Sequence, residues 1–315
     1  MSGIPVIDLS QSGSTDSIAR ACEEIGFFCV TGHGVNEAML DSSWRAAREF
    51  FDLPLDARMR VAMPYAGYPY GYSPLSGETL ARSLGDSAPP DRKQSFAIGP
   101  VTMPAHTITD PDEEFAWSPN LWPEELPMLR KSWTDRYTAL SELAARLLSL
   151  MAESLRLPTD YFDSMIDRHT SAMRALDYPG VADSTAAISD GQWGASAHTD
   201  YGTLTILETD PDQPGLQVRR SDDEWIDVDA PRGALVVNLG DAMERWTNDR
   251  WRSTLHRVTI PAGRRQSIAF FHNANWDAVI ECLPTCLEPG EEARHSPIAA
   301  GPHLMSKFKS TVNRY

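Results

Sequence analysis

Short strand-like runs separated by turn residues fill the chain from residue 171 onward, and no other feature restricts the fold as strongly. These runs are rich in β-branched and aromatic residues, and Gly, Pro and Asp interrupt them at short intervals. They span residues 173–179, 215–218, 225–228, 234–240, 256–260 and 267–272. The pattern predicts a mainly β core, closed as a jelly roll or double-stranded β-helix of the cupin-like kind.

The first half of the chain has helical periodicity instead. Apolar residues recur at helical spacing over residues 15–25, 38–51 and 128–155. Residues 63–100 are rich in Gly, Pro and Tyr and lack clear periodicity, which favours an ordered functional loop. The predicted class is therefore α+β, with a β core and flanking helices.

We expect one domain over residues 1–315, in which a helical and loop region (1–170) packs on a jelly-roll core with a C-terminal tail (171–315). The predicted N-terminal helices lack enough paired apolar faces to form an independent core, and the barrel needs them as cover. The length of 315 residues is sufficient to bury a sizeable core.

Charge and cysteine usage restrict the partners. A formal net charge of −16 disfavours binding to nucleic acid or to anionic membranes, because like charges repel. No apolar run approaches the length of a membrane helix, and the N-terminus lacks the features of a signal peptide. The four cysteines are too few for a disulfide scaffold, so we expect reduced thiols and a cytoplasmic protein. We expect a monomer or a weak oligomer.

A His-x-Asp triplet stands at His198 and Asp200, within a strand-like run. Residues i and i+2 of a strand point to the same face, so the imidazole and the carboxylate converge. The triplet alone is equally typical of a surface strand with two polar residues. His256, in a second strand-like run, offers a third ligand. Two His and one carboxylate with open positions opposite them suit non-haem Fe(II) and oxygen activation.

An Arg-x-Ser triplet follows, at Arg265 and Ser267. The two side chains share one face of a predicted strand. A guanidinium binds a carboxylate through two parallel hydrogen bonds, and a nearby hydroxyl adds a third donor. The triplet therefore predicts a site that holds a carboxylate.

His-x-Asp, then His, then Arg-x-Ser is an ordered pattern that resembles the Fe(II)/2-oxoglutarate dioxygenases of the isopenicillin N synthase-like family. The resemblance covers nearly the whole chain and includes the segment GFFCVTGHG at residues 26–34, in which we interpret His33 as a structural turn residue. It implies that His198, Asp200 and His256 bind Fe(II), and that Arg265 and Ser267 bind 2-oxoglutarate.

The same resemblance assigns Tyr178, just before Pro179, to the 2-oxoglutarate carboxylate next to iron. Many family members have Asn two positions earlier, where this chain has Leu176, so one hydrogen bond to the cosubstrate is missing. The implied reaction couples oxidative decarboxylation of 2-oxoglutarate with O2 to C–H oxidation of a small-molecule metabolite. Hydroxylation, desaturation and ring formation are all outcomes found in this family.

Two other function classes stay open on the sequence alone. In iron oxidases such as isopenicillin N synthase and aminocyclopropane-carboxylate oxidase, the Arg-Ser pair can grip the substrate's own carboxylate. A jelly roll with His ligands could also be a non-catalytic metal-binding module, although Asp200 fits redox iron better. The sequence does not specify the main substrate, and the predicted substrate contacts are Tyr72, Phe96, Arg174, Gln192 and Trp276.

Overall fold

Two β-sheets face each other and form the barrel, and the computed structural model describes residues 3–65, 67–81, 89–181 and 188–311. The large sheet has eight strands in the order β1-β2-β10-β7-β12-β5-β4-β3. These strands are β1 (Val6–Asp8), β2 (Phe27–Thr31), β3 (Gly71–Ser73), β4 (Gln94–Ile98), β5 (Ala172–Tyr178), β7 (Leu204–Thr209), β10 (Leu235–Leu239) and β12 (Arg265–His272).

The small sheet has four strands in the order β6-β11-β8-β9. They are β6 (Ala195–His198), β8 (Leu216–Arg219), β9 (Trp225–Asp227) and β11 (His256–Val258). Apolar residues from both sheets, among them Tyr178, Val218 and Ala269, form one buried cluster between them. This cluster defines the barrel interior and confirms the predicted double-stranded β-helix class.

Alternation along each strand gives the large sheet two different faces. On β12, Ala269 joins the cluster between the sheets, whereas its neighbours Ile268 and Phe270 join a second cluster beneath the helices. We call these the interior face and the helix face. Arg265 and Ser267 have the same parity as Ala269, so both lie on the interior face.

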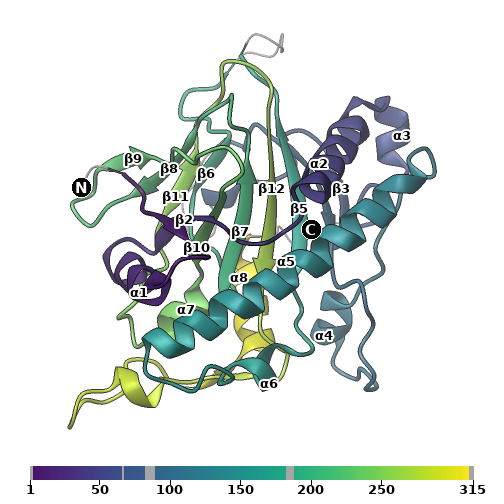
Figure 1. Cartoon of the computed structure of the whole chain (residues 1–315). Helices are drawn as coiled ribbons and strands as arrows, with labels where there is room; N and C mark the ends of the chain where they lie inside the picture. The colour runs from purple at the N-terminus through teal and green to yellow at the C-terminus, as the bar shows by residue number, and fades with distance from the viewer. Residues whose placement is uncertain (1–2, 66, 82–88, 182–187, 312–315) are drawn as a thin grey trace.

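The helix face is covered by a long helix, α5 (Pro127–Ser154), which crosses the sheet diagonally in Figure 1. Its buried stripe matches the periodicity seen in the sequence and includes Trp133, Leu140 and Leu147. Two helices pack beside it, α1 (Ser14–Glu24) and α2 (Glu37–Asp52), and the short α3 (Leu55–Met59) follows α2. The three predicted helices are thus confirmed to within a residue or two at each end.

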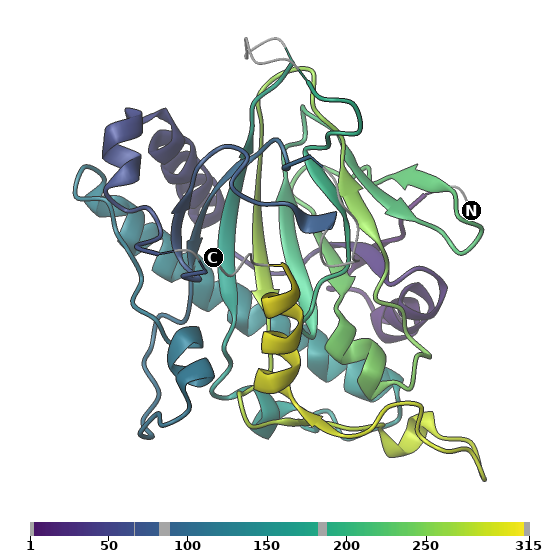
Figure 2. The same ribbon diagram turned by 180° about the vertical axis from the view of Figure 1, so that it is seen from behind.

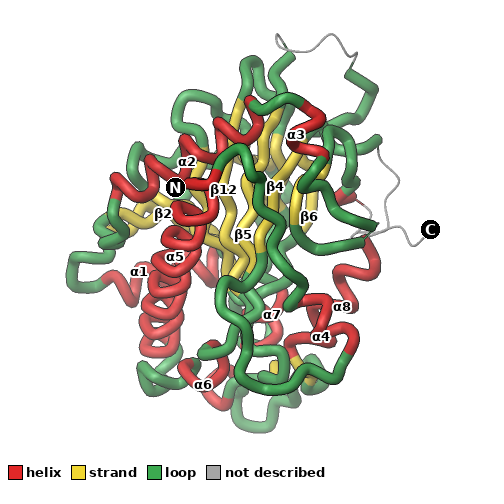
Figure 3. Tube along the Cα trace, turned by 90° about the vertical axis from the view of Figure 1, so that its right-hand side faces the viewer, coloured by secondary structure: helices red, strands yellow, loops and turns green. Residues whose placement is uncertain are grey.

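The opposite side of the large sheet carries the C-terminal helix α8 (Ala300–Thr311), shown in yellow in Figure 2. Figure 3 shows α5 and α8 on opposite sides of the strands. The remaining elements are α4 (Pro111–Ala116), α6 (Asp163–Ile166), α7 (Asp241–Trp246), a 3-10 turn (Pro284–Cys286), β13 (Val279–Ile280) and β14 (Ile298–Ala299). The end of the predicted tail, residues 312–315, lies outside the described part.

The division at residue 170 does not separate helices from sheet. Four strands that precede it, β1 to β4, belong to the large sheet. Two of them, β3 and β4, lie in the 63–100 segment that we expected to be a loop, where residues 66 and 82–88 are outside the described part. Alternation in Gln94–Ile98 is the signal for β4, with Phe96 and Ile98 on one face. Among the described helices, none is both long and apolar enough to cross a membrane.

Candidate metal centre

The pairing of β6 with β11 brings the two predicted histidine ligands together. His256 lies directly opposite His198 in this antiparallel pair, and the centroids of their rings are 4.3 Å apart. Asp200 follows two residues after His198, and its Oδ1 lies 3.8 Å from His256 Nε2. One ligand atom from each of the three side chains lies within 4.8 Å of the others. The structure therefore gathers the three residues at one point.

Hydrogen bonds to the backbone orient both imidazole rings. His198 Nδ1 lies 2.7 Å from the Ser196 carbonyl oxygen, and His256 Nδ1 lies 3.1 Å from the Thr254 carbonyl oxygen. A carbonyl oxygen only accepts, so each Nδ1 carries the hydrogen and donates it. Each Nε2 is left with a lone pair, which is the form in which histidine binds a metal.

The Asp200 carboxylate is oriented in the same manner by two interior-face side chains. Its Oδ2 accepts hydrogen bonds from Thr205 Oγ1 at 2.6 Å and from Asn238 Nδ2 at 2.7 Å. These bonds occupy one oxygen and leave Oδ1 directed toward the histidines. Sequence reasoning did not identify Thr205 or Asn238 as partners of Asp200, although the alternation of β7 and β10 places both on the interior face.

The charge states of the site favour a cation. Burial, together with the neighbouring His256, lowers the pKa of His198 to about 4, so its ring is neutral near pH 7. Burial alone would raise the pKa of Asp200, but the histidines and the bonds from Asn238 and Thr205 outweigh it and lower the pKa. A neutral imidazole at His198 and an ionised carboxylate at Asp200 are states that metal binding requires.

The chain turns sharply just after Asp200, at Gly202. A Cβ built on Gly202 would come within 2.2 Å of the His272 carbonyl oxygen, and Gly202 also lies against Gly240. Only glycine allows this close backbone approach. The turn therefore holds the backbone that follows Asp200 against the ends of β10 and β12.

Arg265 lies on the interior face opposite Tyr178 of β5. It is 1% exposed, its Cζ lies 5.0 Å from the centroid of the Tyr178 ring, and its Nε donates to the Gln213 carbonyl oxygen at 3.1 Å. Its Nη1 is buried and has no hydrogen-bond partner among the residues that the structure describes. A buried guanidinium nitrogen without a partner fits an anionic ligand such as a carboxylate. Ser267, one interior position along β12, lies beside it.

Arg174 also lies on the interior face, because it is opposite Ala269 in the pairing of β5 with β12. Its Nη1 contacts both carboxylate oxygens of Glu78, at 2.9 and 3.0 Å. Gln192 connects two loops by donating to the Pro90 carbonyl oxygen at 2.9 Å, and the ring of Trp276 packs against Gly301 of α8. These three assignments to a substrate stay predictions.

The structure contradicts the expectation that Tyr72 and Phe96 contact a substrate beside the metal centre. The two residues are paired across β3 and β4, and both belong to the cluster under the helices. Phe96 packs on Phe50 and Trp133, and the Tyr72 hydroxyl donates to Gln94 Oε1 at 2.7 Å. Both rings therefore point away from the interior, because this stretch of strand has the opposite phase from the one a pocket would need.

A buried charge network near His198 escaped the sequence analysis. Lys93 Nζ lies 2.9 Å from Asp91 Oδ2 and 3.6 Å from Glu78 Oε2, and Glu78 in turn pairs with Arg174. The signal available in the sequence is the group of charges in Asp91-Arg92-Lys93 just before the apolar residues of β4, since charges there must be paired when buried.

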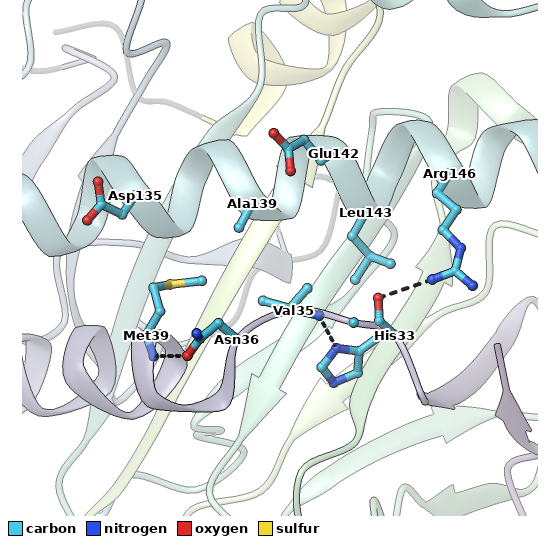
Figure 4. A pocket seen from close by; sticks show the side chains of 10 residues that line it. His33, Val35, Asn36, Met39, Asp135, Ala139, Glu142, Leu143 and Arg146 are labelled. Atoms are coloured by element: carbon cyan, nitrogen blue, oxygen red, sulfur yellow. Dashed lines mark hydrogen bonds between the residues drawn. The ribbon is translucent and has the colours of Figure 1, made fainter. Parts of the chain in front are cut away.

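A cavity of about 420 Å³ lies elsewhere, between the β2–α2 loop and α5 (Figure 4). His33 has three roles there: its Nδ1 accepts from Val35 N–H, its Nε2 contacts the Gly233 carbonyl oxygen, and its own carbonyl accepts from Arg146. The interpretation of His33 as a structural turn residue is confirmed. This cavity is on the helix side of the large sheet and is separate from the metal centre.

Comparison with known proteins agrees with this geometry. Residues 4–125 match the family model for the N-terminal region of a non-haem dioxygenase in morphine synthesis, and residues 169–274 match the 2OG-Fe(II) oxygenase superfamily. A 2-oxoglutarate-Fe(II) type oxidoreductase of Emericella nidulans is 33% identical over 98% of this chain and 90% of its own. A homoarginine-6-hydroxylase of Arabidopsis thaliana is 32% identical over 96% and 91%.

A solved structure is similar over the same extent. A full-length Neurospora crassa protein, crystallised in complex with α-ketoglutarate, superposes with a TM-score of 0.85 and 28% identity, over 98% of this chain and 96% of that one. The similarity thus includes both the N-terminal region and the barrel, and the barrel holds the three gathered side chains.

Proposed function

Because the chain belongs to the Fe(II)- and 2-oxoglutarate-dependent oxygenases, we propose that His198 Nε2, His256 Nε2 and Asp200 Oδ1 are its iron ligands. The convergence of one ligand atom from each of these residues within 4.8 Å carries the proposal. Two imidazoles and one carboxylate on one side of a metal leave positions for a chelating 2-oxo acid and for O2. The closed ligand set of a structural zinc site would leave none.

Arg265, Ser267 and Tyr178 hold 2-oxoglutarate in this proposal. The three residues form adjacent interior positions on β12 and β5, and the unpartnered Arg265 Nη1 suits the distal carboxylate. When bound, Fe(II) with 2-oxoglutarate and O2 supplies the oxidation of a substrate C–H bond, with succinate and carbon dioxide as co-products. The protein side chains orient the reactants and exclude water. The names of the relatives favour this function over an oxidase without 2-oxoglutarate.

The main substrate is a small molecule, and we place its polar group beside Arg174. Along β5, Arg174 lies two interior positions beyond Tyr178, at the end of the row away from the proposed 2-oxoglutarate carboxylate. The Glu78 and Arg174 side chains are 25% and 21% exposed, whereas Lys93 behind them is only 2% exposed. This pair can therefore contact a ligand, and a charged or strongly polar substrate would fit it. Gln192 and Trp276 are further candidates at the edges of this region.

Succinate formation tests the proposed function. Protein supplied with Fe(II), ascorbate and 2-oxoglutarate in air should release succinate slowly alone and faster when a pool contains the substrate. His256→Ala should lose most bound iron and all turnover but remain folded, because one ligand contributes little to a core of this size. A His256→Ala protein that retains full iron content and succinate release would contradict the ligand assignment.

The partners proposed with this function are few. A net charge of −16 disfavours binding to nucleic acid and to anionic lipid, so we propose that the enzyme acts on small molecules. We also propose a cytoplasmic location, which fits the expected reduced thiols. We also propose that the protein is a monomer or a weak oligomer. Sedimentation at micromolar concentration tests the oligomeric state, and a stable tetramer would contradict it.

A further inference from the structure

Asp91 is a carboxylate outside the ligand set, and its side chain is completely buried. It accepts four hydrogen bonds from residues that the structure describes. Its Oδ1 accepts from the Ser196 N–H at 2.9 Å and from the Ser196 hydroxyl at 2.6 Å. Its Oδ2 accepts from the Leu80 N–H at 3.0 Å and from Lys93 Nζ at 2.9 Å. Every partner is a donor, so the ionised form of Asp91 is the one that fits.

Ser196 connects this carboxylate to the metal centre. It lies in β6, and its own carbonyl oxygen accepts the hydrogen bond from His198 Nδ1 at 2.7 Å. The path from Asp91 to the His198 ring therefore runs through a single residue. A shift of the Ser196 backbone would move the acceptor that sets the rotation of that ring.

The strand that carries Ser196 has a neighbouring strand on one side only. β6 has four residues and is the edge strand of the small sheet, so β11 is its only strand neighbour in the described part of the chain. Its pairing with β11 is irregular between His256 and Val258. An edge strand leaves alternate N–H groups unpaired, and Asp91 accepts one of them. Asp91 thus supplies on one side of β6 what a further strand would supply elsewhere.

We propose that Asp91 is a positioning residue for the metal centre, which holds β6 through Ser196 and thereby orients the His198 imidazole. The inference rests on the proposed function, because it takes His198 as a metal ligand. Residues that orient a ligand are known to change metal affinity by about 10- to 100-fold when they are replaced.

The charge of Asp91 is maintained by its surroundings. Burial alone would raise its pKa, but Lys93 and the hydrogen bonds from Ser196 outweigh burial and lower it. An Asn at this position has one oxygen and one NH2 group. In either orientation of the amide, the NH2 group would face two donors, either those of Ser196 or those of Leu80 and Lys93. Asp91→Asn therefore keeps the shape of the side chain and removes the bonding pattern.

The test is titration with Co(II), followed by its visible absorption, for the full-length wild type, Asp91→Asn and Ser196→Ala. Binding of one Co(II) by the wild type, lost in His256→Ala, first establishes the proposed metal site independently. Asp91→Asn should then weaken Co(II) binding about 10- to 100-fold and alter the absorption. Ser196→Ala, which retains the backbone N–H bond, should weaken binding less. It also carries the test if Asp91→Asn does not fold.

Asp177→Asn is the matched control. Asp177 is a second buried carboxylate, 2% exposed, and it binds Arg48, Gln94 and Arg264 on the helix face of the large sheet. Its replacement should lower thermal stability but leave Co(II) affinity unchanged. Equal loss of affinity in Asp177→Asn and Asp91→Asn would show general loosening and overturn the proposal. Wild-type affinity in folded Asp91→Asn would overturn it as well.

Discussion

Replacing Arg265 by Ala removes the interior cation that we propose pairs with the distal carboxylate of 2-oxoglutarate. The guanidinium is 1% exposed, its Nε is committed to Gln213, and its Nη1 has no partner in the described structure. Loss of one member of a buried charge pair costs about 2–5 kcal/mol. At about 1.4 kcal/mol per tenfold, the 2-oxoglutarate concentration for half-maximal turnover should rise about 30- to 4,000-fold.

The assay is succinate release against 2-oxoglutarate concentration at saturating Fe(II). Arg265→Lys should recover little, because an ammonium reproduces neither the two parallel bonds nor the stacking on Tyr178. Ser267→Ala is the matched variant at the neighbouring interior position, and loss of one hydroxyl donor should cost about 1 kcal/mol, or roughly fivefold. With a 2-oxo acid that lacks the distal carboxylate, the concentrations for half-maximal turnover should differ less between the wild type and Arg265→Ala.

An unchanged 2-oxoglutarate requirement in Arg265→Ala would refute this reasoning. If the requirement for the main substrate rose instead, Arg265 would grip the substrate, as in the iron oxidases. The assay separates the two outcomes because slow succinate release without substrate reports on 2-oxoglutarate alone.

Three further predictions concern the surroundings of the site and the whole fold. Asn238→Leu removes a donor to Asp200 Oδ2 and should lower Fe(II) affinity about 10- to 100-fold in a metal titration, whereas unchanged affinity would contradict the role assigned to it. Burial lowers the pKa of His169 and of His303 to about 4, below the unfolded value of about 6.5, so the unfolded chain binds protons first as the pH falls. The stability that these two neutral rings contribute to the folded protein is complete above about pH 6.5 and is lost as the pH falls from about 6.5 to 4. At about pH 5.5 the loss is about 1 kcal/mol for each ring. Urea unfolding at about pH 7.5 and about pH 5.5 should detect it as a lower midpoint in acid. Because β1 to β4 belong to the large sheet, metal-free protein should unfold in a single transition by calorimetry, and two well-separated transitions would argue for two domains.

The convergence of His198, Asp200 and His256 could be predicted from the sequence because much of its geometry is local. His198 is the last residue of β6, and Asp200 lies two residues further, just past the strand end, where its carboxylate still converges with the imidazole as alternation predicts. His256 needed only a second strand. Arg265 and Ser267 follow the alternation rule on β12, and the family resemblance suggested the ligand that we propose for them. These residues required no knowledge of how distant segments pack.

The predicted substrate contacts required such knowledge: the structure contradicts two of the five, and the other three stay predictions. Tyr72 and Phe96 occupy short strands whose phase is set by pairing with β5, which is distant in the sequence. A shift of one residue exchanges the two faces, and residues 63–100 contain no periodicity long enough to fix the phase. The network of Asp91, Lys93, Glu78 and Arg174 was missed for a related reason, since charges look solvent-exposed until the fold buries them.

The two faces of β12 have a consequence for how variation in this chain should be interpreted. Gln266, Ile268 and Phe270 pack toward the helices, whereas Arg265, Ser267 and Ala269 face the interior. In a saturation library scored separately for cellular abundance and for turnover, damage along these six positions should alternate. Substitutions at the first three should deplete the folded protein. Arg265 and Ser267 should instead yield abundant but inactive protein, so neighbouring codons of one strand would record two different selective pressures.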